Sequence, residues 1–212
     1  MPELPEVETV VRQLDKVLSG RVIKDIEVLR EKSAMSDLGQ VEGKKIKKVT
    51  RKQKMIVMEF KESDLKLLVH LKMTGQLIYD QNLHELSNKK QSDERVVGGH
   101  PSSDWVDELP SSHTRIIITF KDKSKLFFND QRVFGWMKVV DEGGWENIVN
   151  RLPPDVVDEA FTKDYLVNVL SRSGRAVKLV ILDQQKMGGM GNIYANDALW
   201  LSRINPKENQ TN

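Results

Sequence analysis

The sequence has 212 residues, 39% of them hydrophobic and 30% charged, a balance that predicts a globular protein of one or two domains and excludes wholesale disorder. No run approaches the roughly 18 apolar residues of a membrane span, and the acidic start lacks the basic and apolar regions of a secretory signal. We therefore expect a cytoplasmic protein with no membrane partner. Zero cysteines exclude disulfides, thiol nucleophiles and Cys-ligated metals. The four histidines share no metal-type spacing, so no cofactor is expected; they are His70, His84, His100 and His113.

The net charge of +2 says nothing about nucleic acid, but the charge is unevenly distributed. Seven bases and no acid lie between Lys44 and Lys54. Such a basic stripe is typical of a strand edge that resists pairing with another chain. It is also typical of a surface that binds a nucleic-acid backbone.

The first half of the chain predicts one helix followed by strands. Apolar residues at helical spacing predict a helix over Glu6–Leu18, which Pro5 begins and Gly20 ends. Short Val-, Ile- and Phe-rich segments then predict a β-sandwich or barrel. The segments are Arg21–Leu29, Ile46–Thr50, Met55–Phe60, Leu65–Leu71, Gln76–Tyr79, Arg115–Phe120, Lys125–Asn129 and Trp136–Val140. Asp80–Ser112 shows neither the helical nor the strand period of apolar residues, which indicates a loop.

After Asp141 the period becomes helical, so we expect two domains, residues 1–140 and 141–212, and an α+β fold. Helices are predicted over Trp145–Leu152, Lys163–Ser171, Arg175–Gln184 and Asn192–Leu201. Thr162 is a candidate N-cap for the second of them.

The first six residues can carry chemistry. Removal of Met1 would leave Pro2 with a free secondary amine, which at a pKa of roughly 8 is partly unprotonated and nucleophilic. Glu3 and Glu6 lie close enough to serve as a general acid. The alternative is that these residues form a rigid start to a helix, whose positive end favours acids.

Two further patterns are compatible with DNA binding. The glycine-rich turn before Asn192 could offer backbone N–H groups to a phosphate, although tight helix packing explains its glycines equally well. Met73, Arg132 and Phe134 are predicted on turns, where they could fill the gap left by a flipped nucleotide. The alternative places Met73 and Phe134 in the core of the sandwich.

Together these segments resemble the formamidopyrimidine-DNA glycosylase (Fpg/Nei, MutM-like) family. The likeness is carried, in the family's order, by MPELPEVETV, RKQKMIVMEF, HLKMTGQL, SSHTRIIITF, NDQRVFGW and LDQQKMGGMGNIYANDALW. It implies an N-terminal helix and β-sandwich followed by a helical domain with a helix–two-turn–helix motif. It also implies a monomeric base-excision repair enzyme, a DNA glycosylase with AP lyase activity, whose partner is damaged double-stranded DNA and whose substrates are oxidised purines such as 8-oxoguanine and formamidopyrimidines.

The resemblance assigns roles to individual residues. Pro2 matches the nucleophile that forms a Schiff base with C1′, Glu3 the acid, and Glu6 a supporting carboxylate. Lys54 matches a phosphate-contacting proton donor. The DNA-binding residues it implies are Met73, Arg132 and Phe134, which fill the void of the flipped base, together with His113, Lys178 and Asn192.

The chain departs from the family pattern at its end. Members normally continue into a zinc-binding hairpin with four cysteines, and here there are none. We expect a chain truncated before that hairpin, with no zinc site. The alternative function is a catalytically silent DNA-binding fragment of the same fold. A structural nucleic-acid binder, for example of RNA, is a third reading.

Overall fold

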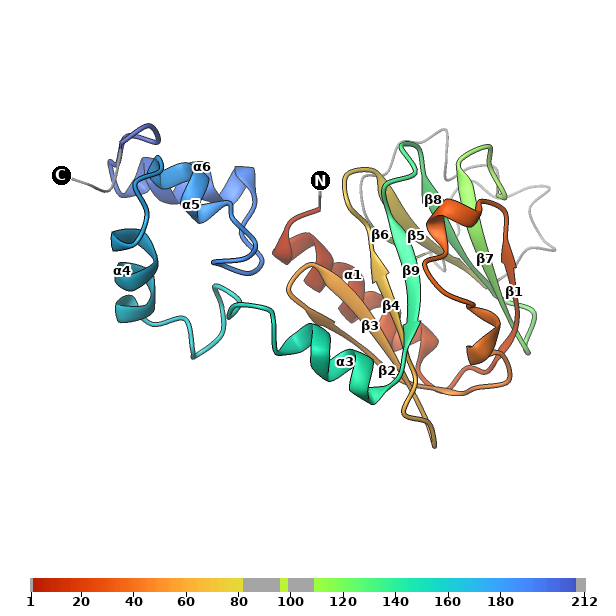
Figure 1. Ribbon diagram of the computed structural model, residues 1–212. Coiled ribbons are helices and arrows are strands. Elements are labelled where there is room, and N and C mark those ends of the chain that lie inside the picture. The colour runs from red at the N-terminus through yellow and green to blue at the C-terminus, as the bar shows by residue number, and fades with distance from the viewer. Residues whose placement is uncertain (1, 82–95, 99–108, 209–212) are drawn as a thin grey trace. The chain divides into compact units, whose positions relative to one another are not determined.

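The computed structural model describes residues 2–81, 96–98 and 109–208, with the backbone alone at 96–98 (Figure 1). The described chain forms two units, residues 1–146 and 147–212. Within these described ranges, no helix is both long and apolar enough to cross a membrane.

The first unit is a helix packed with two antiparallel sheets. Helix α1 (Leu4–Leu18) is followed by a five-stranded sheet in the order β1-β7-β8-β5-β6 and a four-stranded sheet in the order β2-β3-β4-β9. The strands are β1 (Ile23–Val28), β2 (Ile46–Lys52), β3 (Met55–Phe60), β4 (Lys66–His70), β5 (Gly75–Asp80), β6 (Val96–Gly98), β7 (Thr114–Phe120), β8 (Lys125–Asp130) and β9 (Trp136–Val140). The α+β fold with a sandwich is confirmed.

One apolar cluster joins α1 to the inner faces of both sheets. On α1 the buried residues recur at helical spacing, among them Val7, Leu14 and Leu18. Gly20, at φ +88°, follows the helix in a conformation that glycine adopts without steric cost. Asp15 Oδ1 accepts a hydrogen bond from Val49 N–H on the edge strand β2 at 2.7 Å, which fixes the helix beside this sheet.

The expected elements are found, with corrections at one strand and two helices. Each predicted strand exists, with ends shifted by no more than two residues. The expectation of a loop over Asp80–Ser112 is wrong at Val96–Gly98, which pairs with β5 as β6. Three residues are too few to show an alternating period, and this is why the pattern missed them. Most of the rest of that segment lies outside the described residues.

The second unit is helical, and helix α3 (Glu142–Val149) leads into it. It contains α4 (Lys163–Ser171), α5 (Val177–Ile181) and α6 (Asn192–Leu201). The Thr162 cap is confirmed, because its Oγ1 accepts from Tyr165 N–H at 3.1 Å. Helix α3 begins three residues before the predicted Trp145, where Asp141 Oδ1 accepts from Gly144 N–H. Helix α5 is shorter than the predicted Arg175–Gln184.

Candidate nucleic-acid interface and catalytic amine

The predicted nucleophile, Pro2, lies two residues before α1 in a segment that also carries Glu3 and Glu6. Pro2 is buried, and Glu3 is only 3% exposed. Glu3 is the N-cap of α1 and forms a capping box with Glu6, whose Oε2 accepts from Glu3 N–H at 2.8 Å. The rigid helix start foreseen as the alternative is therefore present. Glu3 directly follows Pro2 in the sequence.

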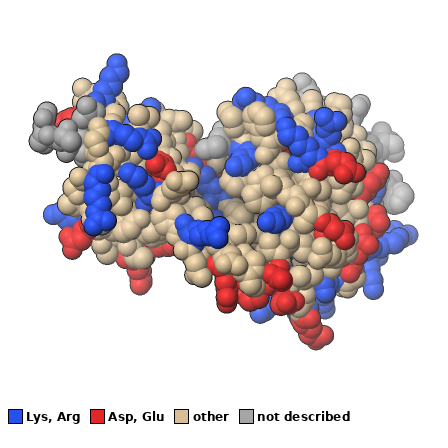
Figure 2. All heavy atoms as spheres, viewed as in Figure 1, with Lys and Arg blue, Asp and Glu red and all other residues tan. Residues whose placement is uncertain are grey.

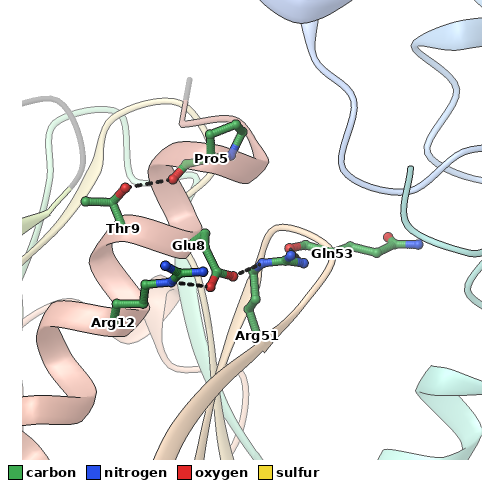
Figure 3. Close-up of polar contacts among 6 residues, drawn as sticks. All are labelled: Pro5, Glu8, Thr9, Arg12, Arg51 and Gln53. Atoms are coloured by element: carbon green, nitrogen blue, oxygen red, sulfur yellow. Dashed lines mark hydrogen bonds and ion pairs between the residues drawn. The ribbon is translucent and has the colours of Figure 1, made fainter. Parts of the chain in front are cut away.

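Lys54 lies at the tip of the β2–β3 hairpin, which is tied to α1 (Figure 3). Arg51 Nε donates to Glu8 Oε2 at 2.7 Å, and Arg51 Nη1 reaches Gln53 O at 3.4 Å. Hydrogen bonds from Arg12 and then Arg51 hold the pKa of Glu8 below its usual value. Because the ion pair is anchored on the second turn of α1, the hairpin tip is fixed relative to the start of the helix. Lys54 itself is 5% exposed.

The basic stripe, residues 44–54, runs along an edge strand and into this hairpin. Lys47 and Lys48 are exposed on β2, and Lys48 Nζ lies 3.3 Å from Glu59 Oε1. In the view of Figure 2, Lys and Arg are spread over the middle of the visible face of each unit. The strand-edge reading of the stripe is confirmed. Its binding to a DNA backbone stays a prediction.

The role of His70 was missed in the sequence, where it is the second-last residue of the predicted strand Leu65–Leu71. It faces Met55 in the β3–β4 ladder, and its ring lies 5.7 Å from that of Trp136. Burial, with contributions from Lys72 and Lys54, lowers the pKa of His70 to about 4. Its Nδ1 accepts from Lys72 N–H at 3.0 Å, so Nε2 carries the proton of the neutral ring.

The pKa of His70 predicts acid sensitivity. His70 binds a proton near pH 6.5 in the unfolded chain but only near pH 4 in the folded chain. The contribution of His70 to stability is therefore fully present above pH 6.5 and is lost as the pH falls toward 4. We expect the protonation of His70 to lower the free energy of unfolding by about 2 kcal/mol between pH 7 and pH 5. Urea titrations at the two pH values measure it, with His70→Gln as the reference. An equal pH dependence in the two proteins would contradict it.

The three predicted void-filling residues come together on two neighbouring turns. Met73 is 43% and Phe134 46% exposed, so the alternative that placed them in the core is wrong. Arg132 Nη1 lies 3.2 Å from Met73 Sδ, and its guanidinium lies 4.8 Å from the centre of the Phe134 ring. His113, half-buried, precedes β7, and its carbonyl accepts from Asp130 N–H at 2.9 Å.

In the second unit, Asn192 is the exposed first residue of α6, after a glycine turn. Gln184 holds this turn, since its Nε2 donates to Met190 O at 2.7 Å and its Oε1 accepts from Gly189 N–H at 3.3 Å. The N–H groups that begin a helix attract anions. Lys178 lies on α5, which packs against α6.

The residues present do not fit a zinc site of the four-cysteine kind, because the sequence has no cysteine. Among the side chains that the structure describes, no three His, Asp or Glu gather as metal ligands either.

A helix-plus-sandwich unit followed by a helical unit is the arrangement of the Fpg-type DNA glycosylase fold. Residues 1–137 match the model of the formamidopyrimidine-DNA glycosylase N-terminal domain, and residues 152–212 match that of the formamidopyrimidine-DNA glycosylase H2TH domain. The chain belongs to the formamidopyrimidine-DNA glycosylase family.

Relatives and solved structures agree with this membership. The chain is 33% identical to the formamidopyrimidine-DNA glycosylase of Ligilactobacillus salivarius over 98% of its own length and 68% of that protein. It is 35% identical to that of Pelotomaculum thermopropionicum, with 98% and 68% covered. The Lactococcus lactis Fpg complex with abasic-site DNA superposes with a TM-score of 0.80 at 25% identity, covering 99% of this chain and 70% of that one. The Thermus thermophilus MutM structure gives 0.77 at 28%, covering 99% and 67%.

Proposed function

We propose that this protein is a base-excision repair DNA glycosylase with AP lyase activity, which removes oxidised purines such as 8-oxoguanine and formamidopyrimidines from double-stranded DNA. The observation that carries the proposal is the buried pair Pro2 and Glu3 at the start of α1, in a chain of this family. The Lactococcus lactis relative of the same fold is described in complex with abasic-site DNA.

The chemistry begins once Met1 is removed. The Pro2 nitrogen attacks C1′ of the damaged nucleotide, and the bond between C1′ and the base breaks with its electron pair going to the base. Glu3 protonates the leaving base, regains a proton from the Pro2 nitrogen, which carries a positive charge after its attack, and passes this proton to O4′ as the sugar opens. The product is an iminium between Pro2 and C1′. Water then takes a proton from C2′, the electron pair of that C–H bond forms a C2′–C3′ double bond, and the 3′-phosphate leaves with Lys54 as its proton donor. Glu6 supports Glu3.

DNA binding divides between the two units. In the first, the basic stripe and Lys54 contact phosphates, His113 lies against the duplex, and the exposed turn residues fill the space of the extruded base. In the second, Lys178 and Asn192 hold the backbone. We propose that the protein acts as a monomer on its DNA.

Borohydride trapping tests the function. The protein, with its N-terminus defined by intact mass, is incubated with a duplex containing 8-oxoguanine or an abasic site, and the iminium is reduced to a stable amine. We expect a covalent adduct of protein without Met1. If protein with a free Pro2 nitrogen binds the duplex and yields no adduct, the protein is instead a silent DNA-binding member of the family. If the protein binds lesion-free duplex or RNA as tightly as duplex with a lesion, the hypothesis of a structural nucleic-acid binder is favoured.

A further inference from the structure

A single buried carboxyl group connects the two turns that carry Met73, Arg132 and Phe134. Asp130 ends β8, faces Gly75 in the β5–β8 ladder, and is 0% exposed. It therefore cannot touch DNA in this conformation. Any effect of Asp130 on binding must pass through the residues that it holds.

The Asp130 side chain accepts four hydrogen bonds. Its Oδ1 accepts from Thr74 Oγ1 and, at 3.2 Å, from Arg132 N–H. Its Oδ2 accepts from Phe134 N–H at 2.8 Å and from Gly135 N–H at 2.6 Å. Thr74 Oγ1 also accepts from Arg132 N–H at 3.1 Å, so one hydroxyl and one carboxyl group together tie the 71–75 turn to the 130–135 turn.

The backbone of Asp130 extends the same network toward β7. Its N–H donates to His113 O at 2.9 Å, and its carbonyl accepts from Arg115 Nε at 2.7 Å. Gly135 leaves the room that the carboxyl group needs. A Cβ at this position would lie 2.7 Å from Phe128 Cζ and 3.1 Å from Asp130 Oδ2.

The three exposed side chains contact one another in the structure. Arg132 lies between Met73 and Phe134, against the sulfur of one and the ring of the other. Ordering such long side chains at an interface costs roughly 0.5–1.5 kcal/mol for each, and a framework that orders them beforehand removes much of that cost from binding. Four hydrogen bonds to one buried carboxyl group provide such a framework.

We propose that Asp130 is a positioning residue that preassembles Met73, Arg132 and Phe134 for insertion into the gap left by an extruded nucleotide. This inference rests on the proposed function, because it assumes that the three side chains enter a DNA stack. Asp130 takes no part in the chemistry at Pro2. Its role is to set the geometry of two turns from inside the sandwich.

The Asp130→Asn variant tests the proposal. In this variant an amide nitrogen replaces one carboxylate oxygen, and this nitrogen cannot accept hydrogen bonds from the N–H groups that face it. The probe is a duplex with a tetrahydrofuran abasic analogue opposite 2-aminopurine, whose fluorescence rises when insertion unstacks it. We expect the fluorescence rise at saturating protein to fall about tenfold, the scale of losing hydrogen bonds to a charged group. Trapping on a single-stranded abasic oligonucleotide, where no stack is entered, should stay within about twofold of wild type.

A milder variant and a matched control separate positioning from loss of stability. Thr74→Val removes one donor to the same carboxyl group, and we expect it to lower the fluorescence rise about threefold. Asp80→Asn alters another buried acid, 3% exposed, at the opposite end of the same β5–β8 ladder, and should leave the rise unchanged. If Asp130→Asn does not fold, the comparison of Thr74→Val with Asp80→Asn decides.

The outcomes separate this inference from the proposed function. If the wild-type protein gives a fluorescence rise but no covalent adduct, the proposed enzymatic activity is refuted. The positioning role of Asp130 would still hold in that case, provided that its variants lose the rise. Adduct formation together with an undiminished rise in Asp130→Asn and Thr74→Val would overturn the positioning role and leave the enzyme standing. No rise with the wild-type protein would overturn the positioning role directly.

Discussion

Protein that retains Met1 should form no borohydride-trapped adduct with abasic DNA, whereas protein that begins at Pro2 should. The reason is electronic: with Met1 in place the proline nitrogen belongs to an amide, and resonance withdraws its lone pair from nucleophilic attack. Pro2→Gln provides protein that retains Met1, because a residue of this size after the initiator Met prevents its removal, and it also lacks the proline nitrogen itself. We expect trapping to fall by at least about a thousandfold, the scale on which removing a covalent nucleophile acts in other enzymes.

Pro5→Ala is the matched control for the amine. Pro5 is an exposed proline in the first turn of α1, three residues after Pro2, and it has no free nitrogen to lose. We expect its adduct yield to remain within about twofold of wild type. Intact mass spectrometry of each adduct measures both the N-terminus and the yield. Equal trapping by Met1-retaining and Pro2-terminal protein would show that another amine, not Pro2, reacts.

The helices and strands could be predicted from the sequence wherever the pattern of apolar residues extended over enough positions to be recognised. The helix α1 was predicted from its buried stripe with a start two residues too late, and the strand over Met55–Phe60 was predicted with the bounds that it has, because it is a short, nearly continuous apolar run. Strand β6, three residues within a polar stretch, could not emerge this way. Its pairing with β5 depends on a partner distant in sequence and on no local signal.

The candidate site was accessible only in part. The pattern placed Met73 and Phe134 on turns but left burial in the core open as an alternative, and the structure shows that both are exposed. His70 and Asp130 were not foreseen. The neutrality of His70 depends on its burial beside Lys72 and Lys54, and the role of Asp130 depends on hydrogen bonds to a turn 56 residues away in the sequence. Both are consequences of tertiary packing.

Gly75 controls the turn that presents Met73, and Gly75→Ala should destabilise the protein strongly. A Cβ there would lie 2.4 Å from Leu71 O and 2.8 Å from Leu71 Cα, and these are backbone atoms that cannot rotate away. Gly75 N–H also donates to Leu71 O at 2.9 Å, so relieving the clash breaks the turn's own hydrogen bond. We expect the free energy of unfolding to fall by about 2–4 kcal/mol, measured by urea denaturation followed by circular dichroism.

The control for Gly75→Ala is the same substitution in open space, Gly143→Ala. Gly143 lies in the first turn of α3, and a Cβ there would meet only Asp141 Oδ1, at 3.8 Å. Alanine should stabilise this helix by up to about 1 kcal/mol, because it restricts the unfolded chain and favours helix. The two variants are thus expected to shift stability in opposite directions. Similar shifts would mean that the 71–75 turn can relax, and that Met73 is not held by the close approach of Gly75 to Leu71.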